Sequence, residues 1–265
     1  MKRNIIIALM LLTAACGAYA QTAGTAIVAH RGYWNCEEAG FSQNSIASLS
    51  RAQEAGFWGS ECDVHLTSDG IIVVNHDDSF VEKSMVIREH TYEELLALKL
   101  PNGESIPTFD SYLDQFAKGE GTHLVIEFKE ADGSDVVEKV LDALKAHDLF
   151  DPARICFISF SHDACVKVAS LAPGFDVQFL ALTIFSAKSP RKLKAEGING
   201  INYEQRVYSF RPALVRKAHE LGMKVNVWTV NKPSAMEKLI SKGVDLITTN
   251  EPMTLRQILG DKEVR

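Results

Sequence analysis

Residues 59–78 read Gly-Ser-Glu-Cys-Asp-Val-His-Leu-Thr-Ser-Asp-Gly-Ile-Ile-Val-Val-Asn-His-Asp-Asp, a strand, a tight turn at Asp69–Gly70 and a second strand. The two runs, 58–65 and 71–76, are joined by too few residues for the crossover that parallel neighbours require. They therefore form an antiparallel hairpin. This short connection decides the fold, because it removes one strand from the count of a parallel sheet.

The first strand of the hairpin carries acidic side chains on one face. Side chains alternate along a strand, so Glu61 and Asp63 point to the same side. If Leu66 pairs with Ile71, counting along the two strands places His76 opposite Glu61. Two carboxylates and an imidazole then converge, which is the arrangement of a chemical site.

Nine short apolar runs predict strands, and amphipathic helical patterns between them favour parallel strands with crossover helices. A barrel of such units needs eight strands. Because the second hairpin strand is the surplus one, we predict an α/β fold, a (β/α)8 TIM barrel with a rim β-hairpin. The predicted strands are 26–30, 58–65, 71–76, 123–128, 155–159, 177–182, 198–203, 224–230 and 245–249.

Helical patterns occupy the longer connections. Asn44 or Ser45 can cap a helix that ends near Gly56. Apolar residues at helical spacing predict another helix from Asp135 to His147. The connection 77–121 is longer than an ordinary barrel connection. We interpret it as the crossover helix plus a small insertion that roofs the site.

The N-terminus has the pattern of a secretory signal. A short basic start precedes an apolar run from Ile5 to Ala15 and a small-residue cleavage site at Ala18–Ala20. The run is too short for a membrane span. We therefore predict a signal peptide at 1–20, a single domain at 21–265 and an exported protein, periplasmic or secreted. A lipoprotein anchored through Cys16 is the second interpretation.

Composition excludes some classes of function. Without residues 1–20 the chain keeps 26 basic and 34 acidic residues, a net charge of −8. No basic stretch offers a nucleic-acid-binding surface, and no stable membrane span is expected. The spacing of the remaining cysteines resembles no zinc site, and their pairing stays open. They are Cys36, Cys62, Cys156 and Cys165.

A third carboxylate, Glu127, lies in the run 123–128, which a barrel would cover on both sides. An unpaired carboxylate is costly to bury there. An ion pair with Lys129 is one explanation, but residues two apart on a strand are poorly placed for it. Together with Glu61 and Asp63, Glu127 would form an oxygen-only site, so we predict one divalent cation, Ca²⁺ or Mg²⁺.

The first strand ends in His30-Arg31-Gly32. Residues at strand ends point into the active-site mouth of a barrel, although a histidine bonded beneath a loop gives the same pattern. The imidazoles of His30 and His76 have a pKa suited to proton transfer. With a cation, Arg31 and Lys129 they would form a cradle for a phosphodiester.

Three further side chains are weaker candidates. Trp228 is either an apolar wall that binds substrate or a core residue. His65 shares the face of the acids but is expected below them or in solvent. His162 is expected to begin a helix. Of the three, Trp228 is kept as a substrate-binding candidate.

In their order along the chain these motifs resemble the glycerophosphodiester phosphodiesterase family. The resemblance covers about residues 26–255, and the ordered set is specific although no single element is. The matching elements are His30-Arg-Gly32, the Asn44-Ser45 helix start, Glu61-x-Asp63, Thr67-x-Asp-Gly70, Val73-Val-x-His-Asp77, Ile106-Pro-Thr-Phe109, Ile126-Glu-Phe-Lys129, Ser159-Phe-Ser161, Val227-Trp-Thr-Val-Asn231 and Ile247-Thr-Thr-Asn-Glu-Pro252.

The resemblance implies a phospholipase-C-like TIM barrel with a small-molecule substrate. The implied reaction hydrolyses a glycerophosphodiester to an alcohol and glycerol 3-phosphate. Which histidine is the base and which the acid stays open. The implied roles are metal ligands for Glu61, Asp63 and Glu127, base and acid for His30 and His76, and phosphate contacts for Arg31 and Lys129.

One position departs from the family pattern, because Gln43 stands where the family usually has Glu. The loss of this carboxylate removes a negative charge near the proposed metal. Two alternatives therefore stay beside the leading hypothesis. One is an enzyme of the same fold that releases a cyclic phosphate, as related phospholipase D-like toxins do. The other is a weakly catalytic glycerophosphodiester-binding protein.

Overall fold

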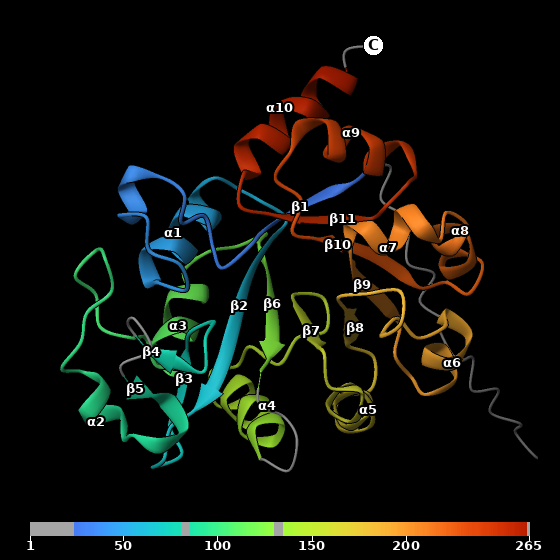
Figure 1. Cartoon of the computed structure of the whole chain (residues 1–265). Helices are drawn as coiled ribbons and strands as arrows, with labels where there is room; N and C mark the ends of the chain where they lie inside the picture. The colour runs from blue at the N-terminus through green and yellow to red at the C-terminus, as the bar shows by residue number, and fades with distance from the viewer. Residues whose placement is uncertain (1–23, 81–84, 130–134, 264–265) are drawn as a thin grey trace, which may run out of the picture.

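The computed structural model describes residues 24–80, 85–129 and 135–263. Eight parallel strands form a closed barrel, in the order β1-β11-β10-β9-β8-β7-β6-β2, and pairing of β1 with β2 closes it. Figure 1 looks towards their carboxyl ends. The predicted (β/α)8 barrel is confirmed. Its strands are β1 (Ala26–Ala29), β2 (Gly59–Leu66), β6 (His123–Phe128), β7 (Ile155–Ser159), β8 (Asp176–Ala181), β9 (Gly200–Glu204), β10 (Lys224–Trp228) and β11 (Leu246–Thr249).

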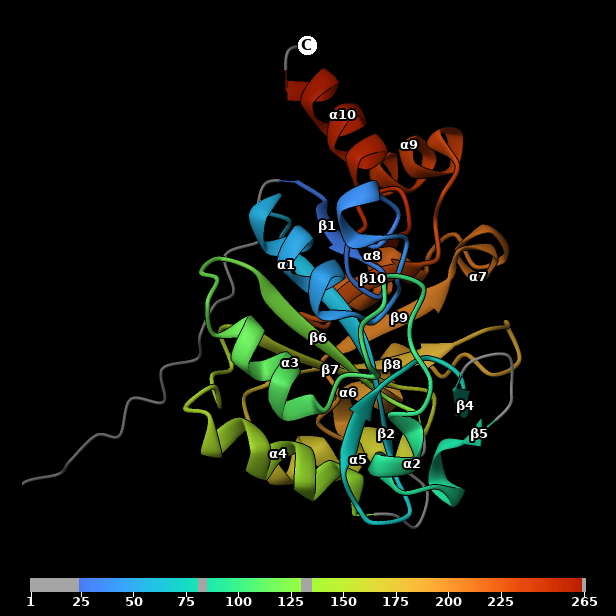
Figure 2. The same ribbon diagram turned by 90° about the vertical axis from the view of Figure 1, so that its left-hand side faces the viewer.

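Helices cover the outside of the barrel, as the two perpendicular views show (Figures 1 and 2). In Figure 2 the carboxyl ends of the strands face right, with α7 and the β4–β5 ribbon on that side. The helices are α1 (Ile46–Glu54), α2 (Tyr92–Leu95), α3 (Phe109–Phe116), α4 (Val136–Ala146), α5 (His162–Leu171), α6 (Pro190–Ala195), α7 (Gln205–Phe210), α8 (Leu214–His219), α9 (Pro233–Ser241) and α10 (Pro252–Glu263), with 3₁₀ turns η1 (Glu37–Ala39) and η2 (Ile87–Glu89).

The two helices predicted from the sequence are present. Ser45, not Asn44, is the N-cap of α1, and its hydroxyl accepts a hydrogen bond from the backbone of Ser48. Helix α4 lies between Asp135 and His147 as expected. Each helix turns its apolar stripe towards the barrel wall, so the main core lies between the strands and the helical layer.

A smaller apolar cluster fills the barrel interior. Its members come from alternate positions of different strands, as in other barrels of this type. Trp228, at the end of β10, packs against it from the carboxyl side. This packing fills the barrel below the mouth, so the side chains at the carboxyl ends of the strands lie above a packed core. The cluster is Val28, Val125, Cys156, Ile158, Leu180 and Leu246.

The hairpin is antiparallel as predicted, but the expected register is wrong by one residue. Strand β3 is short (Ile72–Val74), and Leu66 pairs with Ile72 rather than Ile71. The cause lies in the turn, where Thr67 and Ile71 bond to each other through backbone and hydroxyl groups. These bonds include Ile71 in the turn, so His76 does not stand opposite Glu61.

The connection 77–121 contains the crossover helix α3 and an insertion, as expected. The insertion includes α2 and a ribbon of β4 (Ser79–Phe80) and β5 (Met85–Val86), which pack around Val73. Its expected role as a roof of the site stays a prediction, and its contacts show a further role. Glu104 accepts hydrogen bonds from the first backbone N–H groups of α1, at 2.8 and 3.1 Å. The insertion thus supports the start of α1 from the side.

Two predictions about the N-terminus concern residues that the structure does not describe. They are the signal peptide at 1–20 and the lipid anchor at Cys16. Within the described part of the chain, the cysteines at 36, 62, 156 and 165 are all free thiols. In that same part, none of the helices combines the length and the apolar character needed to cross a membrane.

Candidate active site

Strands β2 and β6 bring three carboxylates together at the barrel mouth. Asp63 on β2 and Glu127 on β6 are neighbours in register, and Glu61 precedes Asp63 on the same face. All three residues are buried. One carboxylate oxygen from each lies within 4.8 Å of the others. The structure therefore brings the three predicted metal-ligand candidates into one cluster.

Burial and mutual repulsion act on this cluster. Burial raises the pKa of Glu61 well above its ordinary value, and the charges of Asp63 and Glu127 add to the shift. Burial also raises the pKa of Glu127 to about 7. For Asp63, burial is outweighed by Lys129, His76 and other partners, so that its pKa is lowered. Without a further positive charge, the burial and mutual repulsion of these ionised carboxylates are unfavourable for folding.

Lys129 supplies part of that positive charge. Its Nζ lies 3.0 Å from Glu127 Oε1 and 3.4 Å from Asp63 Oδ1. The expectation that Glu127 and Lys129 are poorly placed to pair is therefore wrong. Strand β6 ends at Phe128, so Lys129 leaves the regular strand geometry and its long side chain can fold back. Burial lowers the pKa of Lys129, but the two carboxylates outweigh this effect and raise it.

Arg31 and Gly32 form the turn after β1. Arg31 lies in the left-handed region (φ 59°), and its backbone N–H donates to Glu61 Oε2 at 2.8 Å. Its guanidinium donates to Gln43 Oε1 at 2.5 Å. Gly32 has a φ of 80°, and a Cβ there would lie 2.7 Å from the backbone carbon of Ser48. The turn needs glycine at position 32, and it places the positively charged guanidinium of Arg31 next to the carboxylate cluster.

His30 precedes this turn at the end of β1. Its backbone N–H donates to Thr249, and its Nδ1 lies 2.7 Å from Asn250 Oδ1. Its Nε2 faces Glu61 Oε2 at 4.0 Å. Burial lowers the pKa of His30 to about 4, and Arg31 contributes to this shift. The imidazole is therefore neutral near pH 7, with Nε2 turned towards the carboxylates.

His76 lies just beyond β3. Its Nδ1 is 2.7 Å from Asp77 Oδ1, and its side chain is about one third exposed (35%). Burial lowers the pKa of His76, while Asp63 opposes this shift. Of the two positions expected for His65, the one in solvent is wrong: it is 1% exposed, and its Nε2 lies 3.3 Å from the carbonyl of His76. His65 thus supports the loop that carries His76.

Sequence reasoning missed Asn44 as a site residue, since it was considered only as a helix cap. Asn44 has a φ of 52° and donates from Nδ2 to Asp63 Oδ2 at 2.9 Å. Its Oδ1 accepts from the backbone N–H of Asp63 at 3.3 Å. Asparagine tolerates the left-handed region better than most residues. An Asn directly before an N-cap serine was the signal that could have indicated this role.

The cluster fits a hard divalent cation. Glu61 Oε1 is buried, and it has no hydrogen-bond partner among the residues that the structure describes. Carboxylate oxygens are the ligands that Ca²⁺ and Mg²⁺ prefer. When all three acids are ionised, they exceed the two cationic side chains, Arg31 and Lys129, by one charge. A bound cation would therefore offset both the repulsion and the unsatisfied oxygen.

The opposite side of the mouth is apolar. The rings of Phe160, after β7, and Trp228, at the end of β10, meet edge to face with centroids 5.4 Å apart. Trp228 donates from its indole nitrogen to the carbonyl of Asn202 at 2.9 Å and is only partly buried. Trp228 thus lines the mouth and also covers the interior core. Its packing agrees with the expected core role, and substrate binding by Trp228 stays a prediction.

We call the two sides of the mouth the charged half and the apolar half. The charged half lies over β1, β2 and β6, and consists of His30, Arg31, Glu61, Asp63, His76, Glu127 and Lys129. The apolar half lies over β7 to β10, and consists of Phe160, Leu182, Phe185, Phe210 and Trp228.

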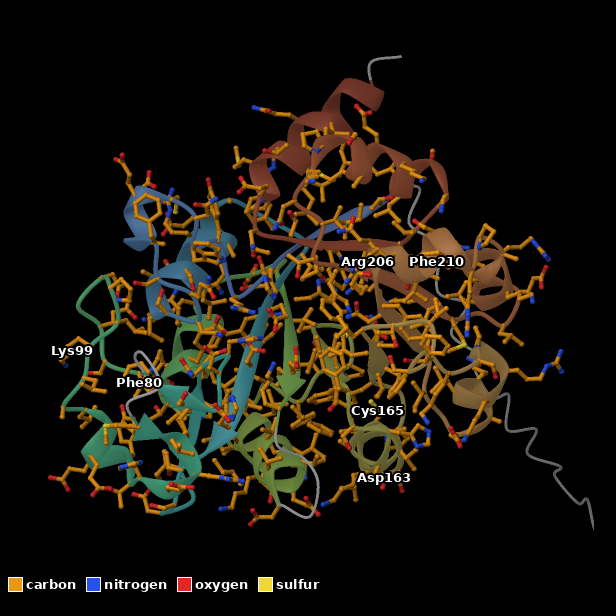
Figure 3. The ribbon with its side chains drawn as sticks, viewed as in Figure 1. Phe80, Lys99, Asp163, Cys165, Arg206 and Phe210 are labelled. Carbon is orange, nitrogen blue, oxygen red and sulfur yellow. The ribbon has the colours of Figure 1, made fainter. Side chains whose placement is uncertain are left out.

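His162 is a residue that the structure leaves outside the site. It begins α5 as predicted, and its Nε2 lies 2.7 Å from Glu196 Oε2 in the helical layer. Figure 3 shows α5 through its labelled neighbours Asp163 and Cys165, well apart from Arg206 and Phe210 on α7. The pair formed by His162 therefore belongs to the packing of the outer layer.

Comparison with known proteins identifies relatives of this chain by sequence and by structure. Residues 30–254 match the model of the glycerophosphoryl diester phosphodiesterase family. A glycerophosphodiester phosphodiesterase of Caldanaerobacter subterraneus is 30% identical, with 87% of this chain and 96% of the relative covered. A solved glycerophosphodiester phosphodiesterase of Parabacteroides distasonis is 39% identical, with a TM-score of 0.84 and coverage of 91% of this chain and 98% of the other.

A further solved structure concerns a complex. It is a phosphodiesterase of Oleispira antarctica bound to its product sn-glycerol 3-phosphate, 25% identical over 89% of this chain and 97% of the other, with a TM-score of 0.77. The family match extends from the histidine after β1 to the first turn of α10, and so spans every barrel strand except β1. On these grounds the chain belongs to the glycerophosphoryl diester phosphodiesterase family.

Proposed function

We propose that the protein hydrolyses glycerophosphodiesters to an alcohol and sn-glycerol 3-phosphate with the help of a divalent cation. The observation that carries the proposal is the buried cluster of Glu61, Asp63 and Glu127, with cationic and imidazole side chains around it. Its relatives named as glycerophosphodiester phosphodiesterases, and the product complex of one phosphodiesterase, support the same substrate class.

The charged half provides the groups that this reaction needs. Glu61, Asp63 and Glu127 would hold the cation, which when bound stabilises negative charge on the phosphoryl oxygens. Arg31 and Lys129 would contact the same oxygens, because both already lie against the carboxylates. Asn44 would keep Asp63 in position through its side-chain amide.

The hydrogen bonds of the two histidines favour distinct roles. Asn250 offers a carbonyl oxygen to His30 Nδ1, so the proton sits on Nδ1 and the lone pair on Nε2. This neutral imidazole is the candidate base that accepts a proton from the attacking water. His76 has a carboxylate, Asp77, at Nδ1. That partner opposes the lowering of the pKa of His76 by burial, so His76 is the candidate acid for the departing alcohol.

Two further parts of the proposal rest on the sequence and on ligand chemistry. The signal-like residues 1–20 support export to the periplasm or the medium. Oxygen ligands suit both Ca²⁺ and Mg²⁺, and Ca²⁺ is the cation that tolerates irregular ligand sets. Comparison of the two cations in one activity measurement would identify the one that works.

Phosphorus NMR of glycerophosphocholine tests the proposal directly. With enzyme and Ca²⁺ or Mg²⁺ we expect the signal of glycerol 3-phosphate, and with EDTA we expect none. His30→Ala should lower the rate by roughly a hundredfold or more, the usual share of general acid–base catalysis. A lasting cyclic phosphate signal would instead indicate transfer to an internal hydroxyl. Full turnover in EDTA would refute the cation, and binding without turnover would refute the enzyme.

A further inference from the structure

The barrel has a second opening, at the amino ends of its strands. A cavity of about 430 Å³ lies there, within the roughly 300–1,000 Å³ of ordinary ligand pockets. The first residues of β1, β6, β8 and β10 line it, among them Ala26 and Lys224. Protein interiors pack closely, and the amino end of such a barrel normally serves stability. A cavity of this size at that end therefore needs an explanation.

One wall of this amino-end cavity is aromatic. The rings of Trp58, just before β2, and His123, the first residue of β6, stack with centroids 4.0 Å apart. Burial lowers the pKa of His123, so its ring is uncharged near pH 7. Lys224 Nζ lies 5.7 Å from the centroid of the Trp58 ring, a distance typical of a cation over an aromatic face. The indole thus already attracts one ammonium group.

The charges around the cavity do not balance. Among the described residues that line it, two aspartates face one lysine. Lys224 donates to Asp176 Oδ2 at 2.8 Å, so this carboxylate is paired. Asp245 Oδ2 lies 2.8 Å from His219 Nε2 and accepts from the backbone N–H of Val225 at 2.8 Å. Both contacts use Oδ2, and the Asp245 side chain is 24% exposed, so its Oδ1 remains an acceptor for a ligand.

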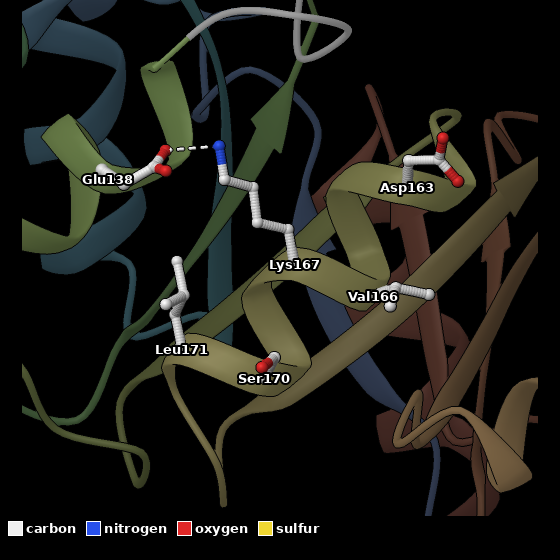
Figure 4. Close-up of a pocket in the computed structure, with 6 residues that line it drawn as sticks. All are labelled: Glu138, Asp163, Val166, Lys167, Ser170 and Leu171. Carbon is white, nitrogen blue, oxygen red and sulfur yellow. Dashed lines mark ion pairs between the residues drawn. The ribbon is translucent and has the colours of Figure 1, made fainter.

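A second hollow of about 420 Å³ lies between α4 and α5 and lacks these features (Figure 4). Lys167 of α5 and Glu138 of α4 form an ion pair beside it, with Nζ and Oε2 2.7 Å apart. None of the described residues that line it is aromatic. Packing between the outer faces of two helices accounts for this hollow, which therefore provides a control for the amino-end cavity.

We propose that the amino-end cavity binds an organic ammonium ion with a flat aromatic body. The body would lie against Trp58 and His123, and the ammonium group would donate to Asp245. A metal ion fits less well, because it needs several oxygen ligands and gains nothing from an aromatic wall. An anion would meet the excess of carboxylates. The site is separate from the charged half of the mouth, which lies at the opposite ends of the strands, so the inference does not depend on the proposed function.

Three indole compounds that differ in charge test this inference. Tryptamine is a cation, tryptophol is neutral and indole-3-acetate is an anion, while the ring stays the same. We would measure their binding by calorimetry at pH 8, above the ordinary pKa of histidine, with Ca²⁺ and Mg²⁺ in excess to occupy the mouth. We expect tryptamine to bind roughly fivefold to tenfold more tightly than tryptophol, because it gains one partly exposed charge pair, and indole-3-acetate to bind most weakly.

Variants locate the bound compound. Ala153 lines the cavity and is exposed, so Ala153→Phe should keep the fold and lower the affinity for tryptamine by roughly tenfold or more, because the new ring occupies the space. Ser170→Phe is the matched control, since it places the same ring at an exposed position of the hollow between α4 and α5. Asp245→Asn should lower the affinity for tryptamine roughly fivefold and leave that for tryptophol unchanged. Its Tm is measured as well, because Asp245 also bonds to the backbone of Val225.

Each outcome bears on the inference. No binding of tryptamine, or equal affinity for the three compounds, overturns the ammonium site. Binding that survives in Ala153→Phe places the compound elsewhere, such as the mouth, and overturns it too. An equal loss in Ser170→Phe also overturns it, because the effect would then be general. Ala153→Phe should hydrolyse glycerophosphocholine as the parent protein does, so failure of the ammonium site leaves the proposed function standing. Binding of tryptamine without any hydrolysis would overturn the proposed function alone.

Discussion

The two halves of the barrel mouth differ in which side chains they bury and which they expose. The charged half buries its three carboxylates and pairs them in part with cationic side chains, as Lys129 does for Glu127 and Asp63. The apolar half leaves large side chains such as Phe185 and Phe210 in solvent. Both arrangements oppose folding stability, the first through buried charge and the second through exposed apolar surface. Stability does not explain either half, so the contrast indicates that the mouth is shaped for a ligand.

The barrel floor makes this contrast possible. Trp228 and the interior cluster that includes Ile158 and Leu180 fill the space below. A filled interior lets neighbouring strand ends carry different chemistry without opening a channel. The charged half depends on precise hydrogen bonds, whereas the apolar half depends on shape and exposure. Substitutions should therefore act very differently on the two sides.

The largest expected effect comes from the centre of the charged half. Glu61→Gln keeps the shape of the side chain but removes one carboxylate of the cation site. We expect turnover of glycerophosphocholine to fall by roughly a hundredfold or more, beyond the tenfold to hundredfold that loss of a group supporting a metal ligand costs. A saturating cation at a hundred times Kd stabilises a protein by about 2.7 kcal/mol. The rise in Tm on adding cation should shrink in the variant.

In EDTA the same variant should be at least as stable as the parent protein. Burial and its acidic neighbours raise the pKa of Glu61, so ionised Glu61 opposes folding, and the neutral amide removes that penalty. Glu93→Gln is the matched control, because Glu93 is exposed on helix α2. This change should alter neither turnover nor Tm. An undiminished cation-dependent rise in Tm would remove Glu61 from the cation site.

The second expected effect concerns a residue that holds the charged half in place. Asn44→Ala deprives the buried Asp63 of a hydrogen bond, which costs about 1–3 kcal/mol, and puts alanine in the left-handed region at about 1–2 kcal/mol more. Asn44→Gly relieves the second cost but not the first. We expect thermal unfolding to rank the proteins as parent, Gly and then Ala. Equal Tm for parent and Asn44→Gly would contradict the role of the amide.

Much of this architecture could be predicted from the sequence, for reasons of chain length and alternation. A turn as short as that at Asp69–Gly70 forces a hairpin, and the remaining strands then number eight. Alternation likewise put Glu61 and Asp63 on one face, and a carboxylate in a buried strand indicated Glu127 as their partner. Such inferences depend on periodicity, which tertiary contacts do not alter.

The errors arose where irregular backbone replaces periodicity. Thr67 bonds Ile71 into the turn and shifts the register by one residue. Lys129 leaves strand β6 and folds back onto the carboxylates. Asn44 reaches Asp63 only because its backbone is left-handed. In each case a local bond or a positive φ decides the geometry, and only for Asn44 did the sequence hold a signal, its place directly before an N-cap serine.

A third prediction concerns Gln43, where the charged half departs from the family pattern. Gln43→Glu adds a negative charge next to Arg31, whose guanidinium already bonds to this side chain. We expect the cation to bind roughly threefold to tenfold more tightly by calorimetry, because the added charge is close but shared with Arg31. Gln257→Glu makes the same change on an exposed face of α10 and should leave affinity unaltered. Unchanged or weaker binding in Gln43→Glu would contradict an influence of the charge at position 43 on cation affinity.

The smallest expected effect on the small substrate lies in the apolar half. Phe160→Ala removes the edge-to-face contact with Trp228, and such ring pairs contribute about 0.5–1.5 kcal/mol beyond the area they bury. Phe160 is already 45% exposed, so we expect a loss of unfolding free energy near the lower end of that range. Turnover of glycerophosphocholine should fall by only a few fold, since the proposed function places its phosphate over the charged half. A loss as large as that of Glu61→Gln would break the division, because Phe160 would then position the reacting phosphate itself.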